Sequence, residues 1–284
     1  MSAGDDDRCN GSADKDAAPI IIDGKSIAER ICARLKQQRE ALGSEVCPHL
    51  VAIQVGNDKS SNVYIQKKKE AAAQIGIRFT LHRLESSISQ AELRALITKL
   101  NEDREVHGII IQLPLPAGFE PSIIELVDPA KDVDGFHPLN RGRLITRGSN
   151  PLFIPCTPKA CIELLSHIGV NLCGKTVVVI GRSNTVGMPL ANLLISYDAT
   201  VTVCHSKTSN LADAVRTGDV VIVAIGVPKF VKGSWLKKSA VVIDVGINSI
   251  PDDSRESGYR LVGDVDFESV LPYVSAISPV PGGL

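Results

Sequence analysis

The stretch Thr176-Val-Val-Val-Ile-Gly-Arg-Ser-Asn-Thr-Val-Gly187 leads from a β-branched segment through a glycine turn into an apolar segment that begins at Met188. β-branched residues favour strands, and a near-continuous apolar run is typical of a strand covered on both faces of a parallel sheet. A tight turn at Gly181 would direct backbone N–H groups and a helix N-terminus toward an anion, and Gly187 would let the helix pack closely on the strand. The stretch predicts the strand, turn and helix of a nucleotide-binding domain.

The spacing of this stretch is G-x-S-x-x-x-G rather than the G-x-G-x-x-G of the common fingerprint, so a plain strand-turn-helix remains an alternative. The next strand, Thr200–Cys204, continues into His205-Ser-Lys207 without the acidic residue that usually accepts the ribose hydroxyl of NAD. With Arg182, Ser206 and Lys207 nearby, a 2′-phosphate would find donors, which favours NADP. The alternative is that Arg182 and Lys207 are solvated loop charges.

The rest of the chain alternates short apolar runs with amphipathic stretches, which indicates βα units and an α/β fold with a mainly parallel sheet. We expect a disordered acidic tail over residues 1–18, an α/β domain over 19–155 and a Rossmann-like, doubly wound domain over 156–284. Two of the helices begin at a serine suited to cap them, and the Pro- and Gly-rich segments 113–118 and 129–155 are expected to be loops. The expected strands are 50–55, 77–82, 108–112, 176–181, 200–204, 219–224 and 240–245, and the expected first helices are 26–42, 60–75 and 89–101.

Composition excludes several classes of function. With 31 basic and 32 acidic side chains in 284 residues, the chain has no global cationic field, so we expect no nucleic-acid or anionic-membrane partner. Its apolar runs are shorter than the roughly 20 residues of a membrane helix. Seven scattered cysteines without a C-x-x-C pair indicate a reducing compartment. The acidic start resembles no secretory signal or transit peptide, so we expect a cytoplasmic protein that is not secreted, with a mitochondrial one as the alternative.

Ser61, Tyr64 and Lys68 are spaced i, i+3 and i+7 within a predicted helix, so a hydroxyl, a ring and an amine would share one face. The alternative is a solvated face made by Lys67, Lys68 and Lys69, with Tyr64 as a half-buried support.

Gln112 follows a predicted buried strand, and ligands gather beyond the carboxyl ends of parallel strands. Asp132 and Asp134 could serve a metal or simply form a turn. No further ligand cluster completes the pair, so we expect no metal site. The histidines are dispersed and no G-x-S-x-G motif occurs, which argues against metalloenzymes and serine hydrolases.

Six blocks occur in order along the chain: Tyr64-x-x-x-Lys68, Gly108-Ile-Ile-Ile-Gln-Leu-Pro-Leu-Pro116, Lys131-Asp-Val-Asp-Gly135, Pro155-Cys-Thr-Pro158, Gly181-Arg-Ser-Asn-Thr-Val-Gly-Met-Pro189 and Pro279-Val-Pro-Gly-Gly283. From about Ile20 to Leu284, this order resembles the bifunctional methylenetetrahydrofolate dehydrogenase/methenyltetrahydrofolate cyclohydrolase (FolD) family. The resemblance implies that 5,10-methylenetetrahydrofolate is oxidised with NADP to the methenyl form, which is then hydrolysed to 10-formyltetrahydrofolate. It also implies a homodimer that binds tetrahydrofolate derivatives in a cleft between the domains.

The resemblance also implies residue roles. It makes Lys68 the catalytic amine, Gln112 its hydrogen-bonding partner, Tyr64 a contact of the folate rings and Asp134 the anchor of the pterin. It places Ile111, Leu113, Pro281, Gly282 and Gly283 along the folate pocket, and Thr157, Gly181, Arg182, Ser183, Ser206 and Ile247 beside the dinucleotide.

In the family, the Pro-Gly-Gly segment continues through Gly-Pro-Met-Thr into a final helix that packs on the first domain, whereas the sequence printed here stops at Leu284. If that were the natural end, we would expect a cleft without one wall and lower catalytic efficiency. Two other functions stay open. A different NADP-dependent two-domain dehydrogenase, acting on a small hydroxy acid, would need no Tyr64 and Lys68 pair, and a non-catalytic folate- or nucleotide-binding module would show no turnover.

Overall fold

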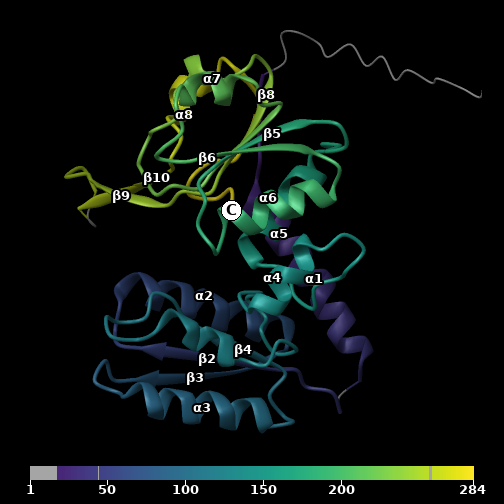
Figure 1. The fold of residues 1–284 in the computed structure, drawn as a ribbon, viewed down its shortest axis with the longest axis vertical. Coiled ribbons are helices and arrows are strands. Elements are labelled where there is room, and N and C mark those ends of the chain that lie inside the picture. Colours follow the sequence, from purple (N-terminus) through teal and green to yellow (C-terminus); the bar gives the residue numbers. More distant parts are fainter. Residues whose placement is uncertain (1–17, 44, 256–257) are drawn as a thin grey trace, which may run out of the picture.

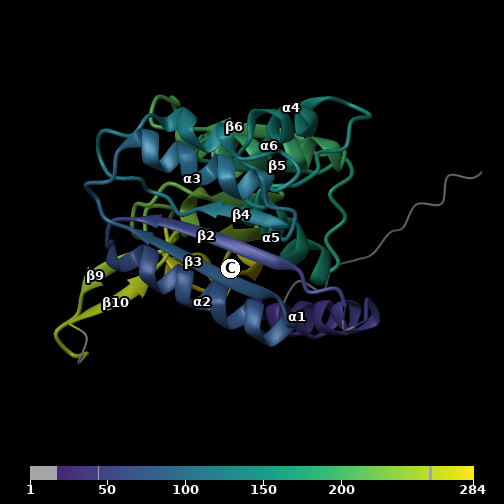
Figure 2. The ribbon, with the colours of Figure 1, turned by 90° about the horizontal axis from the view of Figure 1, so that it is seen from below.

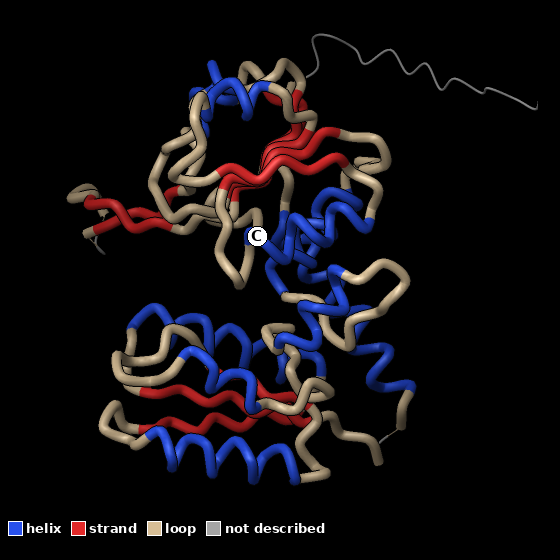
Figure 3. The backbone as a smooth tube through the Cα atoms, in the orientation of Figure 1, coloured by secondary structure: helices blue, strands red, loops and turns tan. Residues whose placement is uncertain are grey.

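The computed structural model of the chain describes residues 18–43, 45–255 and 258–284. Two lobes are visible in Figure 1, each built around its own sheet, and the C-terminus lies between them. Figure 3 shows the strands gathered in these two places and helices beside both. The expected α/β class with two domains is confirmed. Apart from Ala18, the expected acidic tail lies outside the described residues.

The first lobe holds a three-stranded parallel sheet in the order β3 (Arg78–Leu84), β2 (His49–Val55) and β4 (Gly108–Ile111). Helices α2 (Lys59–Ile75) and α3 (Gln90–Glu102) cover its opposite faces, as Figures 1 and 2 both show. Every residue of β4 is buried, which fits its uninterrupted apolar sequence. The three strands expected here are confirmed, with shifts of one or two residues at their ends.

Side chains at the helix starts fix where these helices begin. Ser89 caps α3 in a full capping box with Glu92, as a serine start predicts. Asp58 caps α2, and Asp23 caps α1 (Gly24–Ala41), in each case by accepting from the backbone N–H three residues later. At these two helices the cap is an aspartate that lies before the serine, so each helix begins earlier than a serine cap would place it, and the carboxylate also interacts favourably with the positive helix N-terminus.

The second lobe holds a six-stranded parallel sheet in the order β1 (Ile20–Ile21), β11 (Val274–Ile277), β8 (Ala240–Asp244), β7 (Val220–Val223), β5 (Thr176–Ile180) and β6 (Thr200–Cys204). One core cluster joins the sheet to α5 (Cys156–His167) and α6 (Gly187–Ser196). The other lies with α7 (Leu211–Arg216) and α8 (Phe267–Val270). The expected doubly wound arrangement and its four strands are confirmed.

The edge strand β1 comes from the start of the chain, where the first domain was expected to begin. Ile20 pairs with Ala276 and Ile21 with Ile277, in parallel. A strand of two residues has no periodic signal, and its partner lies at the other end of the sequence. Helix α1 then contacts both α5 and α2, so this segment links the lobes. The division between residues 155 and 156 remains a prediction, with β1 as a segment that crosses it.

The expected loop over residues 129–155 is wrong in part, because it contains α4 (Pro138–Ile145). Pro138 stands in the first turn, where the missing N–H costs nothing, and the His137 ring accepts from the N–H of Leu139. The remaining elements are η1 (Pro121–Leu126), η2 (Gly233–Trp235) and the hairpin of β9 (Asn248–Pro251) and β10 (Tyr259–Val262). No helix in the described ranges is long and apolar enough to cross a membrane.

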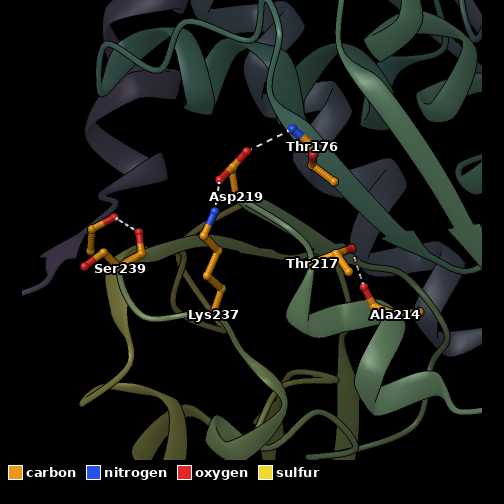
Figure 4. A network of polar contacts seen from close by, with 7 residues as sticks. Thr176, Ala214, Thr217, Asp219, Lys237 and Ser239 are labelled. Carbon is orange, nitrogen blue, oxygen red and sulfur yellow. Dashed lines mark hydrogen bonds and ion pairs between the residues drawn. The ribbon is translucent and has the colours of Figure 1, made fainter.

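The amino ends of the strands in the second lobe are held by an ion pair, drawn in Figure 4. Asp219 accepts from the N–H of Thr176, at the start of β5, at 2.9 Å and from Lys237 Nζ at 2.5 Å. The Lys237 bond is the main cause of a lowered pKa of Asp219. This network lies at the edge of the sheet opposite the carboxyl ends of the strands, where ligands of α/β proteins bind.

Candidate active site

Lys68 and Gln112 come together at the carboxyl edge of the first sheet. Lys68, on α2, donates from Nζ to Gln112 Oε1 at 3.2 Å, and Gln112 Nε2 donates to the carbonyl of Leu113 at 2.9 Å. Lys68 is half-buried, whereas Lys67 and Lys69 are exposed. The three lysines therefore do not form one solvated face, because α2 turns only Lys68 toward the end of β4.

Ser61 and Tyr64 lie on the same helix but in different surroundings. Ser61 is buried, and its hydroxyl donates to the carbonyl of Leu113 at a long 3.5 Å. Tyr64 is 47% exposed, so it is not the half-buried support that was the alternative. Ile111 is the buried last residue of β4. Helix α2 thus carries an exposed ring and, four residues later, an amine that reaches Gln112 at the end of β4.

The two aspartates of the 131–135 block have separate environments. Asp132 is buried and accepts from the N–H of Phe136 and of His137 and from Asn140 Nδ2 at 2.8 to 3.1 Å, so it holds the turn. Asp134 is half-buried, and burial raises its pKa while the Lys68 charge opposes the rise and Asp132 adds to it. No three potential ligands in the described residues cluster as a metal site would require. Asp134 is therefore a half-buried carboxylate whose ionised form is favoured by the charge of Lys68.

The start of α5 lies near these groups and brings the second lobe to them. The Cys156 thiol donates to the carbonyl of Val133 at 3.6 Å. Burial of this thiol, and then the charge of Asp134, raises its pKa, although the residue as a whole is exposed. Thr157 lies in the same turn of α5.

The Pro281 to Gly283 segment reaches the region between the lobes from the far end of the chain. A Cβ on Gly24 would lie 1.7 Å from the carbonyl oxygen of Gly283, so the segment passes directly against the start of α1. Pro281 and Gly282 are exposed, and the C-terminus lies between the lobes in Figure 1. In the described part of the chain, Lys68 forms no hydrogen bond or ion pair with this segment.

A pocket of about 420 Å³ opens at the carboxyl ends of β5, β6 and β7 in the second lobe. Gly181 has φ +126°, and a Cβ there would lie 2.3 Å from the carbonyl oxygen of Ala224, so only glycine fits. A Cβ on Gly187 would meet the Gly181 oxygen at 2.2 Å, which bears out the close helix packing. The residues that line the pocket are Ile180, Gly181, Arg182, Ser183, His205, Ser206, Leu211, Ala224, Ile225, Val227 and Phe230.

The pocket suits an anionic ligand. Arg182 and Ser206 lie in it, and none of its lining residues is acidic, in the part of the chain that the structure describes. Ser183 Oγ accepts from the N–H of Val186 and of Gly187, so it also caps the turn into α6. Lys207, Thr157 and Ile247 are not among the lining residues. The structure thus groups four of the six residues expected to hold the dinucleotide: Gly181, Arg182, Ser183 and Ser206.

Two buried carboxylates next to this pocket were missed by sequence reasoning. Asp244 ends β8 and is 3% exposed, and Asp264 follows β10 and is fully buried. The only signal was the Gly263-Asp-Val-Asp266 sequence after a short apolar run, which reads equally well as a surface turn. The apolar wall of Leu211, Val227 and Phe230 was also missed, since Leu211 begins α7 whereas Val227 and Phe230 lie in the loop after β7.

The fold and the two sites define a class: a two-lobed α/β enzyme with a lysine-centred polar site in one lobe and a Rossmann-like nucleotide pocket in the other. Comparison with known families makes the class specific. The tetrahydrofolate dehydrogenase/cyclohydrolase catalytic domain matches residues 22–134, and the NAD(P)-binding domain of the same family matches residues 155–284. The chain belongs to the tetrahydrofolate dehydrogenase/cyclohydrolase family.

Individual relatives agree with this assignment. The bifunctional protein FolD of Magnetococcus marinus is 48% identical, covering 93% of this chain and 91% of its own. The chloroplastic bifunctional protein FolD 4 of Arabidopsis thaliana is also 48% identical, covering 93% and 74%. Among solved structures, the FolD enzyme of Trypanosoma brucei, in complex with NADP and an inhibitor, has a TM-score of 0.90 at 40% identity and covers 94% of this chain and 92% of that one. The resemblance in the six sequence blocks is therefore confirmed, and the chain is an enzyme of folate-dependent one-carbon metabolism.

Proposed function

We propose that this chain oxidises 5,10-methylenetetrahydrofolate with NADP and then hydrolyses the methenyl product to 10-formyltetrahydrofolate at one site built around Lys68. The observation that carries the proposal is the Lys68 to Gln112 hydrogen bond of 3.2 Å, made by the half-buried member of three consecutive lysines. It presents an amine at the carboxyl edge of a parallel sheet, where substrates of α/β enzymes bind. The exposed Tyr64 ring on the same helix offers a surface for the folate rings.

The proposed chemistry depends more on how the folate is positioned relative to the cofactor and Lys68 than on strong acids or bases. Hydride leaves a carbon that lies between two nitrogens, and the product is a delocalised cation, so the first step requires mainly alignment of the folate. The NADP nicotinamide, when bound, supplies the hydride acceptor. For hydrolysis, water adds to the cationic carbon, loses a proton, and the bond from that carbon to N5 breaks as N5 is protonated. Lys68, held by Gln112, would move these protons.

Asp134 is proposed to bind the pterin. It is half-buried, raised in pKa and close enough to Lys68 to feel its charge. A carboxylate in such surroundings forms strong hydrogen bonds with N–H donors that replace its lost water, and the pterin ring carries such donors. Ile111, Leu113 and Pro281 to Gly283 are proposed to line the folate pocket.

The proposed dinucleotide site uses the pocket after β5. Gly181, Ser183 and the start of α6 would face the phosphates, and Arg182 and Ser206 would take the 2′-phosphate of NADP. The fit rests on the space that glycine leaves at Gly181 and on the absence of an acidic residue among the described residues that line the pocket. Thr157 and Ile247 are proposed as further contacts of the bound cofactor.

One assay tests the proposed function. The chain is mixed with 5,10-methylenetetrahydrofolate and NADP, and the reduced cofactor and the methenyl absorbance are followed together. Formation of NADPH with transient methenyl product supports both activities. Binding of either ligand without turnover would instead show a non-catalytic module, and turnover of a small hydroxy acid would show a different dehydrogenase.

The assembly and the location complete the proposal. We propose a homodimer, with tetrahydrofolate derivatives as ligands and no nucleic-acid or membrane partner, located in the cytoplasm. The six described cysteines are free, which is consistent with a reducing compartment. Light scattering at micromolar concentration measures the assembly, and fractionation of cells measures the location.

A further inference from the structure

A single buried carboxylate joins two loops at the carboxyl edge of the nucleotide-binding sheet. Asp264 Oδ2 accepts from the N–H of Ile225 at 2.7 Å and from the N–H of Gly226 at 2.9 Å, while Oδ1 accepts from Asn248 Nδ2 at 2.8 Å. Ile225 and Gly226 follow β7, and Asn248 begins β9 just after β8. The side chain therefore spans the ends of two neighbouring strands.

The surroundings of Asp264 are unusual for a structural carboxylate. It is fully buried, and its own N–H donates to a second buried carboxylate, Asp244, at 3.0 Å. Among the described residues, no lysine or arginine forms an ion pair with either group. A buried charge that is stabilised only by N–H donors holds those donors tightly, because losing one would leave the charge uncompensated. The positions of the two loops therefore depend on this one side chain.

The two loops contribute to the nucleotide site. Ile225 and Val227 line the pocket that also holds Arg182, and they flank Gly226, whose N–H points at Asp264. Gly226 has φ +67°, a left-handed conformation that glycine adopts without strain, and its N–H is held by Asp264 at the centre of the turn. Ile247, a proposed cofactor contact, immediately precedes Asn248.

We infer that Asp264 is a positioning residue for the dinucleotide: it sets the turn after β7 and the start of β9 so that the cofactor binds, without touching the cofactor itself. The inference rests on the proposed function. It implies that altering Asp264 weakens cofactor binding while leaving methenyl hydrolysis intact, because hydrolysis needs no cofactor and takes place around Lys68 in the other lobe.

The test uses the pairing of Asp264 with Asn248. Asp264→Ala removes the acceptor of three N–H groups. Asn248→Asp replaces a donor to Asp264 by a second carboxylate, which repels that of Asp264. In both variants we expect the KM for NADP to rise about tenfold or more. The double variant Asp264→Asn/Asn248→Asp restores the pairing with donor and acceptor exchanged. The amide at position 264 keeps one oxygen to accept from the N–H groups of Ile225 and Gly226, and its NH₂ donates to the carboxylate at position 248. Its KM for NADP should return to within about threefold of the parent.

The control is Asp266→Asn, two residues away, which removes only the ion pair between the half-buried Asp266 and the exposed Lys232 and should leave the KM for NADP unchanged. Hydrolysis of preformed methenyltetrahydrofolate without nucleotide is measured in every variant and should stay within about twofold of the parent. An unchanged KM for NADP in Asn248→Asp, no recovery in the double variant, or an equal loss of hydrolysis would each overturn the inference. A parent protein that reduces no NADP would instead refute the proposed function.

Discussion

Lys68 Nζ donates to Gln112 Oε1 across 44 positions of sequence, and this bond lies where the buried strand β4 ends beside α2. Lys67 and Lys69, its neighbours in sequence, are exposed. Helical geometry separates the three, because consecutive residues point about 100° apart around the axis. A specific role for one lysine in three can therefore be tested against two matched controls.

Replacing Lys68 by Met keeps most of the apolar stem and removes the amine. We expect cyclohydrolase activity to fall by roughly 10²- to 10⁴-fold, since hydrolysis moves protons to and from water, and dehydrogenase activity to fall less. Lys67→Met and Lys69→Met should retain both activities. The measurement is methenyl hydrolysis and hydride transfer, followed separately in the three variants. Unimpaired hydrolysis in Lys68→Met would end this mechanism.

Asp134→Asn should lower both activities while raising the free energy of unfolding at neutral pH. Burial raises the pKa of Asp134, so its ionised form destabilises the native state above that pKa, and a neutral amide removes the penalty. The control is Asp132→Asn, which disturbs a carboxylate with three donors and should destabilise the fold. Denaturant unfolding and both assays report the result. Chelator treatment of the parent should change nothing, and activity lost on chelation and restored by a divalent ion would contradict the assignment of Asp134.

Arg182→Ala should weaken NADP binding much more than NAD binding. A charge-assisted hydrogen bond to a phosphate contributes on the order of 1.5–3 kcal/mol to binding. NAD lacks the 2′-phosphate, so its binding does not depend on this hydrogen bond. Lys207→Ala is the control, because Lys207 is exposed and does not line the pocket. Titration of both nucleotides into each variant measures the effect. Equal weakening of the two cofactors by Arg182→Ala would refute the role of Arg182.

Gly181→Ala should abolish nucleotide binding and destabilise the second lobe. A Cβ there would lie 2.3 Å from the Ala224 carbonyl oxygen, and φ is +126°. Gly118→Ala provides the comparison, since Gly118 has φ +101° with no atom within 4 Å of an added Cβ, so only the backbone strain of about 1 kcal/mol applies. The melting temperatures of the two variants, measured by thermal unfolding with and without NADP, distinguish the steric clash from backbone strain alone. Similar melting temperatures for both variants would contradict the steric argument.

Because of Asp244, we expect the free energy of unfolding to fall as the pH rises from about 4 to 6. Burial raises its pKa from 3.8 to about 6, with the Asp264 charge adding to the rise and backbone N–H donors opposing it. The folded state then holds a proton that the unfolded state releases, so the stabilisation is complete below the unfolded pKa and is lost as pH passes through the folded pKa. The shift corresponds to on the order of 3 kcal/mol. The free energy of unfolding of Asp244→Asn, measured over the same range, should lack this component, and parallel curves for parent and variant would disprove it.

Much of the architecture follows from local sequence. β-branched runs such as Thr200–Cys204 form strands because their side chains suit a pleated, covered surface, and Gly181 marks the nucleotide turn because a Cβ cannot be accommodated there. The residue types at Lys68, Gln112 and Asp134 likewise indicated which groups could do chemistry. The strand and turn signals can be read from neighbouring residues, although the atom that excludes a Cβ at Gly181 belongs to the distant Ala224. The roles of Lys68, Gln112 and Asp134 came from the resemblance carried by six separate sequence blocks.

Other features were decided by contacts between distant segments. Strand β1 joins the second sheet because β11, at the other end of the chain, leaves an edge for Ile20 and Ile21, and two residues have no period to detect. Lys68 differs from Lys67 and Lys69 only because β4 ends beneath one face of α2. Asp264 joins the loops after β7 and β8 because both donate hydrogen bonds to its buried carboxylate, which forms no ion pair among the described residues. Sequence determined which residues could do chemistry here. Only tertiary packing decided which of them are buried and which form hydrogen bonds with one another. The reason is that desolvation and hydrogen-bond geometry arise from segments far apart in the chain.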